Sequence, residues 1–291
     1  MKQLRFATVC AVLCAGSLAP AFAQPAQCSA HLTPLGVVDA AIDEPLSGAP
    51  GLEAFSLRLR EISDPSCRFQ LSFEVGAQSG GLHGDNGELN FRVTRYAAGG
   101  GILYDSRQPN AADAASLRSD MRLYLIADPG ASPRAGLYNN SIYAVLRAAD
   151  SATELDRQPL ALRASIPAHV QAFLSGASQS NGGYALLDFQ QLTRGETGHA
   201  TLHLRATSDV DISFESENAG ALVNESDGDY HVPYQLSADG QPIDLRRGEQ
   251  VARTPAAVAT RDIGLDVQIG DVSQALAGNY HDRVTVTVSA R

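Results

Sequence analysis

Apolar side chains recur at every second residue through most of this chain. A period of two puts alternate side chains on opposite faces of a strand, so that one face packs on a core while the other meets water. Antiparallel sheets tolerate this one-sided exposure, whereas parallel sheets are generally covered on both faces. Clear alternation occurs at 55–59, 69–75, 89–93, 210–214, 263–269 and 284–288. The pattern predicts an all-β protein with antiparallel sheets.

Turn-forming triplets separate these runs. Examples are Asp85-Asn86-Gly87, Ser226-Asp227-Gly228 and Ala238-Asp239-Gly240. Many short strands with such separators are typical of β-sandwiches. The best helical candidate, residues 113–117, is long enough for one short turn at most.

The chain also repeats itself at an offset of about 141 residues. Phe73 and Phe214 occupy matching tetrapeptides, Leu-Ser-Phe-Glu and Ile-Ser-Phe-Glu. Tyr138 and Tyr280 each follow an Ala-Gly pair and precede a closing strand. Chance similarity between β sequences is the alternative, but the matches keep one order, which favours duplication. We therefore expect two tandem immunoglobulin-like β-sandwich domains, at residues 24–163 and 164–291.

The first 23 residues have the pattern of an export signal. Lys2 and Arg5 precede an apolar stretch, and Ala21-Phe22-Ala23 matches the small-x-small pattern before a cleavage site. A membrane anchor is the alternative, but the apolar run is too short to span about 30 Å of hydrocarbon. The sequence predicts a signal peptide at residues 1–23 and a secreted protein.

The charge of the remaining chain excludes some partners. Removing the signal takes away Lys2 and Arg5, which leaves 20 basic residues against 32 acidic ones and a formal charge of −12. So acidic a chain repels phosphate backbones and anionic lipid headgroups. We expect no nucleic-acid or membrane-surface binding.

Cysteine usage agrees with export. Cys10 and Cys14 lie in the signal, so only Cys28 and Cys67 remain. An even pair in an oxidising compartment predicts one disulfide, with free thiols or a metal pair as the alternatives. Closing this loop would stabilise the fold by about 3–4 kcal/mol.

Motifs for catalysis and for cofactors are missing from the sequence. His199 and His203 could share one strand face, but their neighbours on that face, Thr201 and Arg205, are poor zinc ligands. No Gly-x-Ser-x-Gly elbow, phosphate loop or twelve-residue calcium loop occurs. We expect no enzyme activity, catalytic residues, metal or cofactor. A Ser/His/Asp site stays open, because its members need not be adjacent in sequence.

The second half contains a series of distinctive short motifs. They are Leu187-Asp188-Phe189, Gly195-Glu196-Thr197, the run 213–220, Pro233-Tyr234 and the closing segment 277–286. Through these motifs the second half resembles the spore coat protein U-like domain of archaic chaperone–usher pilus subunits. The first half is similar to the same fold more weakly, through Cys28, Cys67 and the segment around Tyr138. His281 and Arg283 depart from the family's usual Thr or Ser, and the second half lacks the cysteine pair.

The resemblance implies a mechanism of assembly. Subunits of this family are sandwiches that lack their last strand, so the C-terminal domain should expose a row of apolar pockets. A periplasmic chaperone fills this gap first, and the N-terminal strand of the next subunit replaces it at the outer-membrane usher. On this basis Val284, Val286 and Val288 should line the donor-strand groove, with ordinary core packing as the alternative.

The segment before Cys28 suggests a position in the fibre. Residues 24–27 would span only about 13 Å as a strand and include a proline, so they make a poor donor. We expect a pilus tip adhesin at the cell surface that receives a strand but gives none, and that mediates attachment and biofilm formation through an unknown receptor. Loops at the outer end of the first domain, at 40–53 and 97–109, are the expected contacts, with core-facing residues as the alternative. Their adhesive candidates are Ile42, Leu46, Leu52, Leu103 and Tyr104.

Two other functions stay open at the level of sequence. One is a non-adhesive minor pilus or coat-like surface subunit. The other is a periplasmic binding module, or an enzyme, on a sandwich scaffold. The pilus functions require a C-terminal sandwich with an open edge, whereas the periplasmic module requires one that folds alone.

Overall fold

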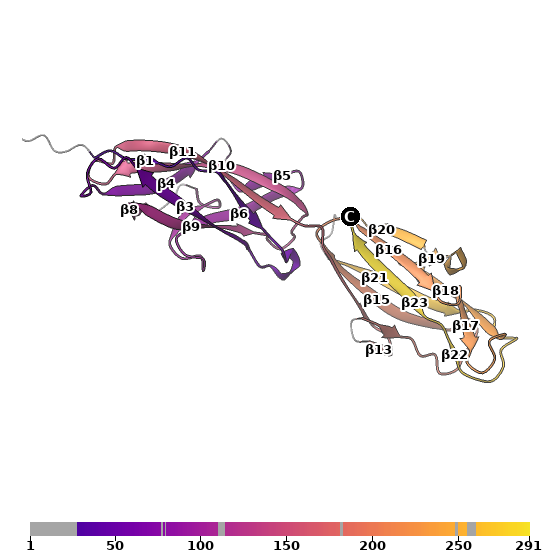
Figure 1. Ribbon diagram of the computed structural model, residues 1–291. Helices are drawn as coiled ribbons and strands as arrows, with labels where there is room; N and C mark the ends of the chain where they lie inside the picture. The colour runs from indigo at the N-terminus through magenta and orange to yellow at the C-terminus, as the bar shows by residue number, and fades with distance from the viewer. Residues whose placement is uncertain are drawn as a thin grey trace, which may run out of the picture.

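The computed structural model describes residues 28–291 except 77, 79, 110–113, 181–182, 248–249 and 255–259. Within these ranges the chain forms two β-sandwiches that lie end to end, with the N-terminal strands in one and the orange-to-yellow C-terminal strands in the other (Figure 1). Helical structure in the described residues is limited to two 3-10 turns, η1 (Pro45–Ser47) and η2 (Leu245–Arg247). The prediction of an all-β chain is confirmed, and the signal peptide lies outside the described residues.

The first sandwich has two layers joined by a hairpin. One layer runs through β1 (His31–Leu32), β3 (Gly51–Arg60), β9 (Asp120–Asp128), β6 (Gly87–Thr94) and β7 (Ile102–Asp105). The other runs through β8 (Ala115–Leu117), β4 (Phe69–Val75), β10 (Gly136–Ala148), β11 (Glu154–Ile166) and β2 (Val37–Ala41). The short strand β5 (Leu82–Gly84) pairs with both β6 and β10 and so connects the layers.

Strand β11 completes this sandwich from within the chain. It pairs antiparallel with β10 from Gly136 to Arg147, and its other edge pairs in parallel with β2. Its inward side chains, Leu160, Leu162 and Ala164, are almost fully buried in the core. The strand beside β10, which is the last strand of this sandwich in the sequence, is therefore supplied by the domain itself.

The expected disulfide between Cys28 and Cys67 is present, with the two sulfur atoms 2.02 Å apart. It joins the first described residue to the loop between β3 and β4. The strands on either side of that loop contribute to the core, which contains Leu57 and Phe69.

The second sandwich follows a strand order similar to that of the first, but in its described residues no strand beside β23 corresponds to β11 or to β2. One layer contains β12 (Val170–Ser175), β15 (Thr197–Ala206), β21 (Thr260–Ile269) and β18 (His231–Ala238), with β19 (Gln241–Ile243) at its edge. The other contains β20 (Gln250–Thr254), β16 (Val210–Ser216) and β23 (Val284–Ala290). Shorter strands are β13 (Gln179–Ser180), β14 (Ala185–Leu186), β17 (Ala221–Asn224) and β22 (Tyr280–His281).

Matching details in the two halves support duplication. Phe73 on β4 and Phe214 on β16 are both buried, and they lie opposite Ala144 on β10 and Val286 on β23. The hydroxyl of Tyr138 donates to the carbonyl of Arg134, at 2.7 Å. That of Tyr280 donates to the carbonyl of Leu276, at 3.1 Å. Both tyrosines thus bond four residues back at the same corner of the sandwich, as in other immunoglobulin-like folds.

Two sequence expectations differ from the structure in detail. The expected boundary between residues 163 and 164 falls inside β11, which continues to Ile166 because Ile166 still pairs with Gly136. The best helical candidate, residues 113–117, is not helical over its last three residues. These form β8, because Ala115 and Leu117 pair with β4 and are buried.

Candidate strand-accepting edge and polar pocket

Strand β23 has one open edge. It pairs with β16 from Val284 to Ala290, and no described residue pairs with its other side. The corresponding strand of the first sandwich, β10, has β4 on one side and β11 on the other. The main-chain N–H and C=O groups along the free side of β23 are therefore available to another strand.

The open edge borders an apolar furrow of about 190 Å³. Both layers of the sandwich line it: β12, β18 and β21 on one side, β16 and β23 on the other. The lining includes Leu174, Leu187, Phe189, Phe214, Leu236, Leu265, Val267, Val284 and Val286. Apolar side chains of this kind remain in contact with water only because the space beside β23 is not filled by the described chain.

The expected groove residues lie on this strand with their side chains toward the core. These residues, Val284, Val286 and Val288, pack against the hydrophobic core of the second sandwich, but each is only partly buried. The equivalent positions of the first sandwich, Ile142, Ala144 and Leu146, are fully buried. This difference in side-chain burial reflects the presence of strand β11 beside β10 and the open edge beside β23.

A polar cluster closes one end of the furrow. The carboxylate of Asp282 accepts hydrogen bonds from the hydroxyls of Ser216, at 2.6 Å, and Tyr234, at 2.5 Å, and from the N–H of Asn218, at 3.0 Å. Burial, followed by the hydrogen bond with Asp282, raises the pKa of Tyr234 well above its usual value. The cluster fixes the turn after β16 and leaves the rest of the furrow apolar.

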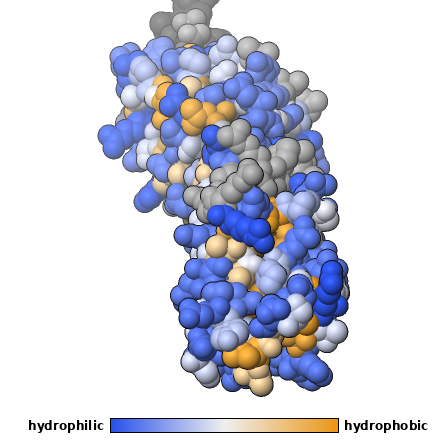
Figure 2. Space-filling view, turned by 90° about the vertical axis from the view of Figure 1, so that its right-hand side faces the viewer, coloured by the Kyte–Doolittle hydropathy of each residue, from blue (hydrophilic) through white to orange (hydrophobic). Residues whose placement is uncertain are grey.

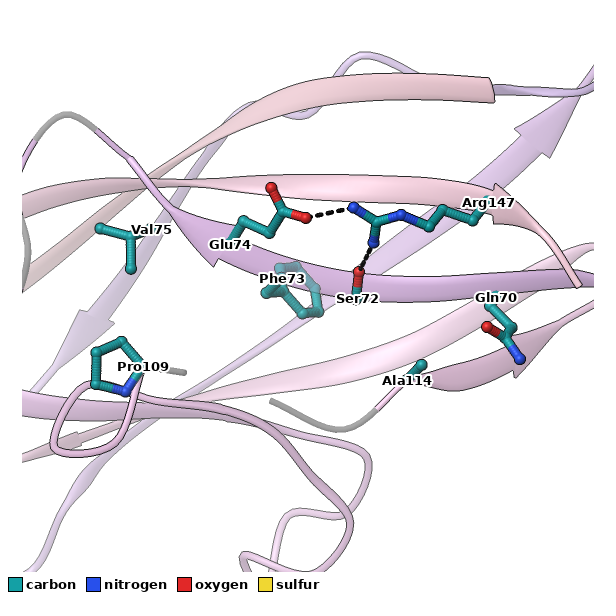
Figure 3. A pocket seen from close by; sticks show the side chains of 8 residues that line it. All are labelled: Gln70, Ser72, Phe73, Glu74, Val75, Pro109, Ala114 and Arg147. Atoms are coloured by element: carbon teal, nitrogen blue, oxygen red, sulfur yellow. Dashed lines mark hydrogen bonds and ion pairs between the residues drawn. The ribbon is translucent and has the colours of Figure 1, made fainter. Parts of the chain in front are cut away.

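The first sandwich has a polar pocket of about 590 Å³ on the outer side of β4 (Figure 3). Ser72 and Glu74 point from β4 toward the guanidinium of Arg147 on β10. Arg147 donates to Ser72 Oγ at 2.7 Å and to Glu74 Oε1 at 2.5 Å. Pro109 and Ala114 face them across the space.

The charges at this pocket are already paired with one another. Arg157 donates to the second oxygen of Glu74, at 2.7 Å, and forms two hydrogen bonds with Glu154. The hydrogen bond from Arg147 is the main reason that the pKa of Glu74 lies below its usual value, with Arg157 adding to it. A ligand here would meet a neutralised, hydrogen-bonding surface rather than a net charge.

Four of the five adhesive-loop candidates are buried, so the expectation that they are exposed is corrected. Ile42 and Leu46 pack beneath the loop between β2 and β3. Leu103 and Tyr104 lie in β7, where Tyr104 stacks on Phe91 with ring centroids 5.3 Å apart. Only Leu52 keeps an exposed side chain, at 46%.

The loop at 42–50 also lies at a different end of the domain from the one expected. β2 runs parallel to β11, and the N–H of Ile42 donates to the carbonyl of Ser165 at 3.0 Å. The second sandwich begins just beyond β11, and the N–H of Ala135 donates to the carbonyl of Thr207 across the junction. This loop therefore faces the second sandwich, and the outer end is formed by loops such as 61–68 and 149–153 (Figure 1).

The face of the molecule drawn in Figure 2 is mostly hydrophilic, and its apolar side chains occur in small groups among polar ones. No three His, Cys, Asp or Glu side chains gather into a metal site within the described ranges. A search of the described residues also finds no helix long and apolar enough to cross a membrane.

Comparisons with known proteins find similarity only among solved structures. No protein-family model and no curated protein matches the chain. A chain of the CsuC–CsuE chaperone–tip adhesion subunit pre-assembly complex, from archaic chaperone–usher Csu pili of Acinetobacter baumannii, is 13% identical. The alignment covers 89% of this chain and 99% of that one, with a TM-score of 0.49.

Two further structures are similar at the same level. The CupB6 tip adhesin from Pseudomonas aeruginosa is 16% identical, with 90% of this chain and 93% of that chain covered and a TM-score of 0.32. A chain from a chaperone–tip adhesin complex of CFA/I fimbriae biogenesis is 13% identical, with 89% and 97% covered and a TM-score of 0.36. These values do not define a family for the chain, and membership of the spore coat protein U-like family stays a prediction.

Proposed function

We propose that this protein is the tip adhesin of a chaperone–usher pilus, and that its C-terminal sandwich accepts a β-strand from a partner. The single observation that carries the proposal is the open edge of β23 above the apolar furrow. An incoming strand would pair with the free main-chain groups of β23, and its alternate side chains would enter the furrow.

The energetics favour such an addition. Fully burying a valine side chain is worth about 1.5–3 kcal/mol, so completing the burial of three half-exposed valines contributes roughly 1 kcal/mol each. New main-chain hydrogen bonds between β23 and the incoming strand add to this gain. Without a partner, the free N–H and C=O groups of β23 bond to water or pair with another exposed strand. A C-terminal sandwich left open is prone to aggregate, which is the reason for a periplasmic chaperone as its first partner.

The two sandwiches would then divide the work. The first, already completed by β11, needs no foreign strand and would contact the surface receptor, whereas the second would join the fibre. In this scheme the subunit passes through the periplasm and the outer-membrane usher, receives the N-terminal strand of the next subunit, and ends at the cell surface. The same edge would serve a non-adhesive minor subunit.

A peptide test addresses the open edge directly. The protein's own β11 supplies the probe, a synthetic peptide of residues 154–166, because it completes the equivalent edge of the first sandwich. We expect it to bind the full mature chain and to slow hydrogen exchange at residues 284–290. A peptide with aspartate in place of Leu160 and Leu162 is the matched control and should not bind.

The proposal fails if the amides of β23 in the free protein exchange as slowly as those of β10, because the edge is then already covered. Immunogold labelling separates the two pilus functions. Label at fibre ends only supports a tip adhesin, and label along the shafts overturns it.

A further inference from the structure

Three polar side chains on the outer face of the second sandwich form one continuous hydrogen-bonded chain. Ser175 ends β12, His203 lies on β15 and Asp262 lies on β21. Ser175 Oγ is 2.6 Å from His203 Nε2, and His203 Nδ1 is 2.6 Å from Asp262 Oδ1. A nucleophile within reach of a base, which is itself oriented by a third group, is the signature of nucleophilic catalysis.

Strand register builds this arrangement from residues far apart in the sequence. His203 lies directly opposite Asp262 on one side and Phe173 on the other. Ser175 is in the next row on the same face, opposite Thr201, which in turn lies opposite Gly264. The serine therefore reaches diagonally from its own row, which contains Thr201 and Gly264, to the histidine in the neighbouring row.

The histidine is held in a defined position. The ring of Phe173 stacks on that of His203, with centroids 4.5 Å apart and an interplanar angle of 20°. The imidazole is 23% exposed. A carboxylate at Nδ1 favours the tautomer with its proton on that nitrogen, which leaves Nε2 free to accept the proton of Ser175.

The residue after the serine provides a turn with free donors. Gly176 has φ of +84°, a conformation that favours glycine, and it directly follows the last residue of β12. The N–H groups of Gly176 and Ala177 donate no backbone hydrogen bond to any described residue. The N–H that follows a catalytic serine is a common donor to the oxyanion of acyl-transfer reactions.

We propose that Ser175, His203 and Asp262 form an acyl-transfer site that acts on esters. Ser175 Oγ bonds to the acyl carbon while His203 Nε2 takes the hydroxyl proton. The carbon–oxygen bond to the alcohol then breaks, and the alcohol leaves with the proton from His203. Water next attacks the acyl-serine, with His203 again as base, which releases the carboxylic acid and restores the serine. Asp262 is a positioning residue that acts through the histidine.

The surroundings indicate the class of substrate. Neither Ser175 nor His203 lines any of the five cavities described for the chain. Phe173, 48% exposed, is an apolar group stacked on the ring of the base, His203. Small esters with apolar or aryl groups fit such an open site, and the reaction does not depend on strand acceptance.

The chain carries its own control for this site. His199 on β15 lies 2.5 Å from Asp266 on β21, so the same pair of side chains recurs four residues along. Among the described residues, His199 has no hydroxyl partner corresponding to Ser175. A variant of His199 therefore tests the effect of losing a surface histidine–aspartate pair without touching the nucleophile.

The test measures covalent labelling by a fluorophosphonate probe and hydrolysis of p-nitrophenyl acetate, on the full mature chain. We expect Ser175→Ala to abolish labelling and His203→Gln to lower both rates by about 100-fold, in the range of general-base catalysis. His199→Gln should stay within about 2-fold of the parent. Asp262→Asn should lower the rate and change its pH profile, because the asparagine favours the other tautomer.

Two results would overturn the proposal. One is equal labelling of the parent and Ser175→Ala, and the other is equal loss in His203→Gln and His199→Gln. Peptide mass mapping of the labelled parent guards against a misfolded variant, because label on any residue other than Ser175 also contradicts the site.

Discussion

The two sandwiches share a strand order but differ at one edge. In the first, β10 lies between β4 and β11, and its inward side chains at 142, 144 and 146 are fully buried. In the second, β23 has only β16 beside it, and the equivalent valines are half-buried. The two strands have the same alternating pattern, so the degree of burial is set by the neighbouring strand and not by the strand's own sequence.

The difference also separates two sources of stability. The first sandwich obtains its last strand and a disulfide from its own chain. The second has neither within the described residues, so part of its folding free energy would come from a partner. A partner that binds only the folded form stabilises it by mass action.

Aspartate placed at the closing strand should have the greatest effect. Leu162→Asp buries an unpaired charge in the first core and should unfold that sandwich, with a loss above about 4 kcal/mol. Val286→Asp, at the half-open edge, should cost the second sandwich about 1–2 kcal/mol but abolish binding of the 154–166 peptide. Calorimetry of the two transitions checks this, and equal losses would contradict the difference between the edges.

Loss of the disulfide should affect only one sandwich. Replacing Cys28 and Cys67 by alanine opens a loop of 39 residues and should lower the free energy of unfolding of the first sandwich by about 3–4 kcal/mol. The second transition should not move, since no cysteine lies in that sandwich. Chemical denaturation of the parent and the double variant measures both, and a matching shift of the second transition would show that the sandwiches unfold together.

Truncation of matched core positions should give unequal losses. Leu146→Ala removes a fully buried side chain and should cost about 3 kcal/mol, within the range for buried leucines. Val288→Ala, at the equivalent position of β23, should cost about 1 kcal/mol or less, because water already reaches that site. Addition of the 154–166 peptide should enlarge the second loss and leave the first unchanged.

Alkaline pH should lower the stability of both sandwiches, and this should give the smallest of the expected differences between them. Burial raises the pKa of Tyr234 in the second sandwich and of Tyr104 and Tyr138 in the first. An unfolded tyrosine loses its proton near pH 10, so this stabilisation is complete below pH 10 and is lost as the pH rises further. Tyr234→Phe should flatten the pH dependence of the second transition only. An unchanged slope after this substitution would assign the effect to another group.

Sequence reasoning predicted the strands from their local alternation, the duplication from matching motifs in one order, and the disulfide because only two cysteines remain after the first 23 residues. It missed the burial of Leu103 and Tyr104. The glycines before them suggested an exposed loop, but Gly99 and Gly101 have positive φ and form a tight turn that returns the chain to β6. Spacing alone could not separate a wide loop from a hairpin.

The Ser175–His203–Asp262 chain was missed for a different reason. Its members are brought together by the pairing of three strands, which alternation does not specify. One signal was present. Asp262 and Asp266 have the same four-residue spacing as His199 and His203, as expected of partners on adjacent antiparallel strands. Such matched spacing identifies candidate pairs, but not the diagonal contact with the serine.

The direction of β23 has a mechanical consequence. The strand runs along the length of its sandwich and ends near the junction with the first sandwich (Figure 1). In the proposed pilus, tension between a surface and the fibre would pull a bound strand parallel to β23, so that the hydrogen bonds along its seven residues share the load and do not separate one at a time. We expect the joint to withstand stretching well even where its equilibrium affinity is modest, and single-molecule pulling along and across the strand would measure the difference.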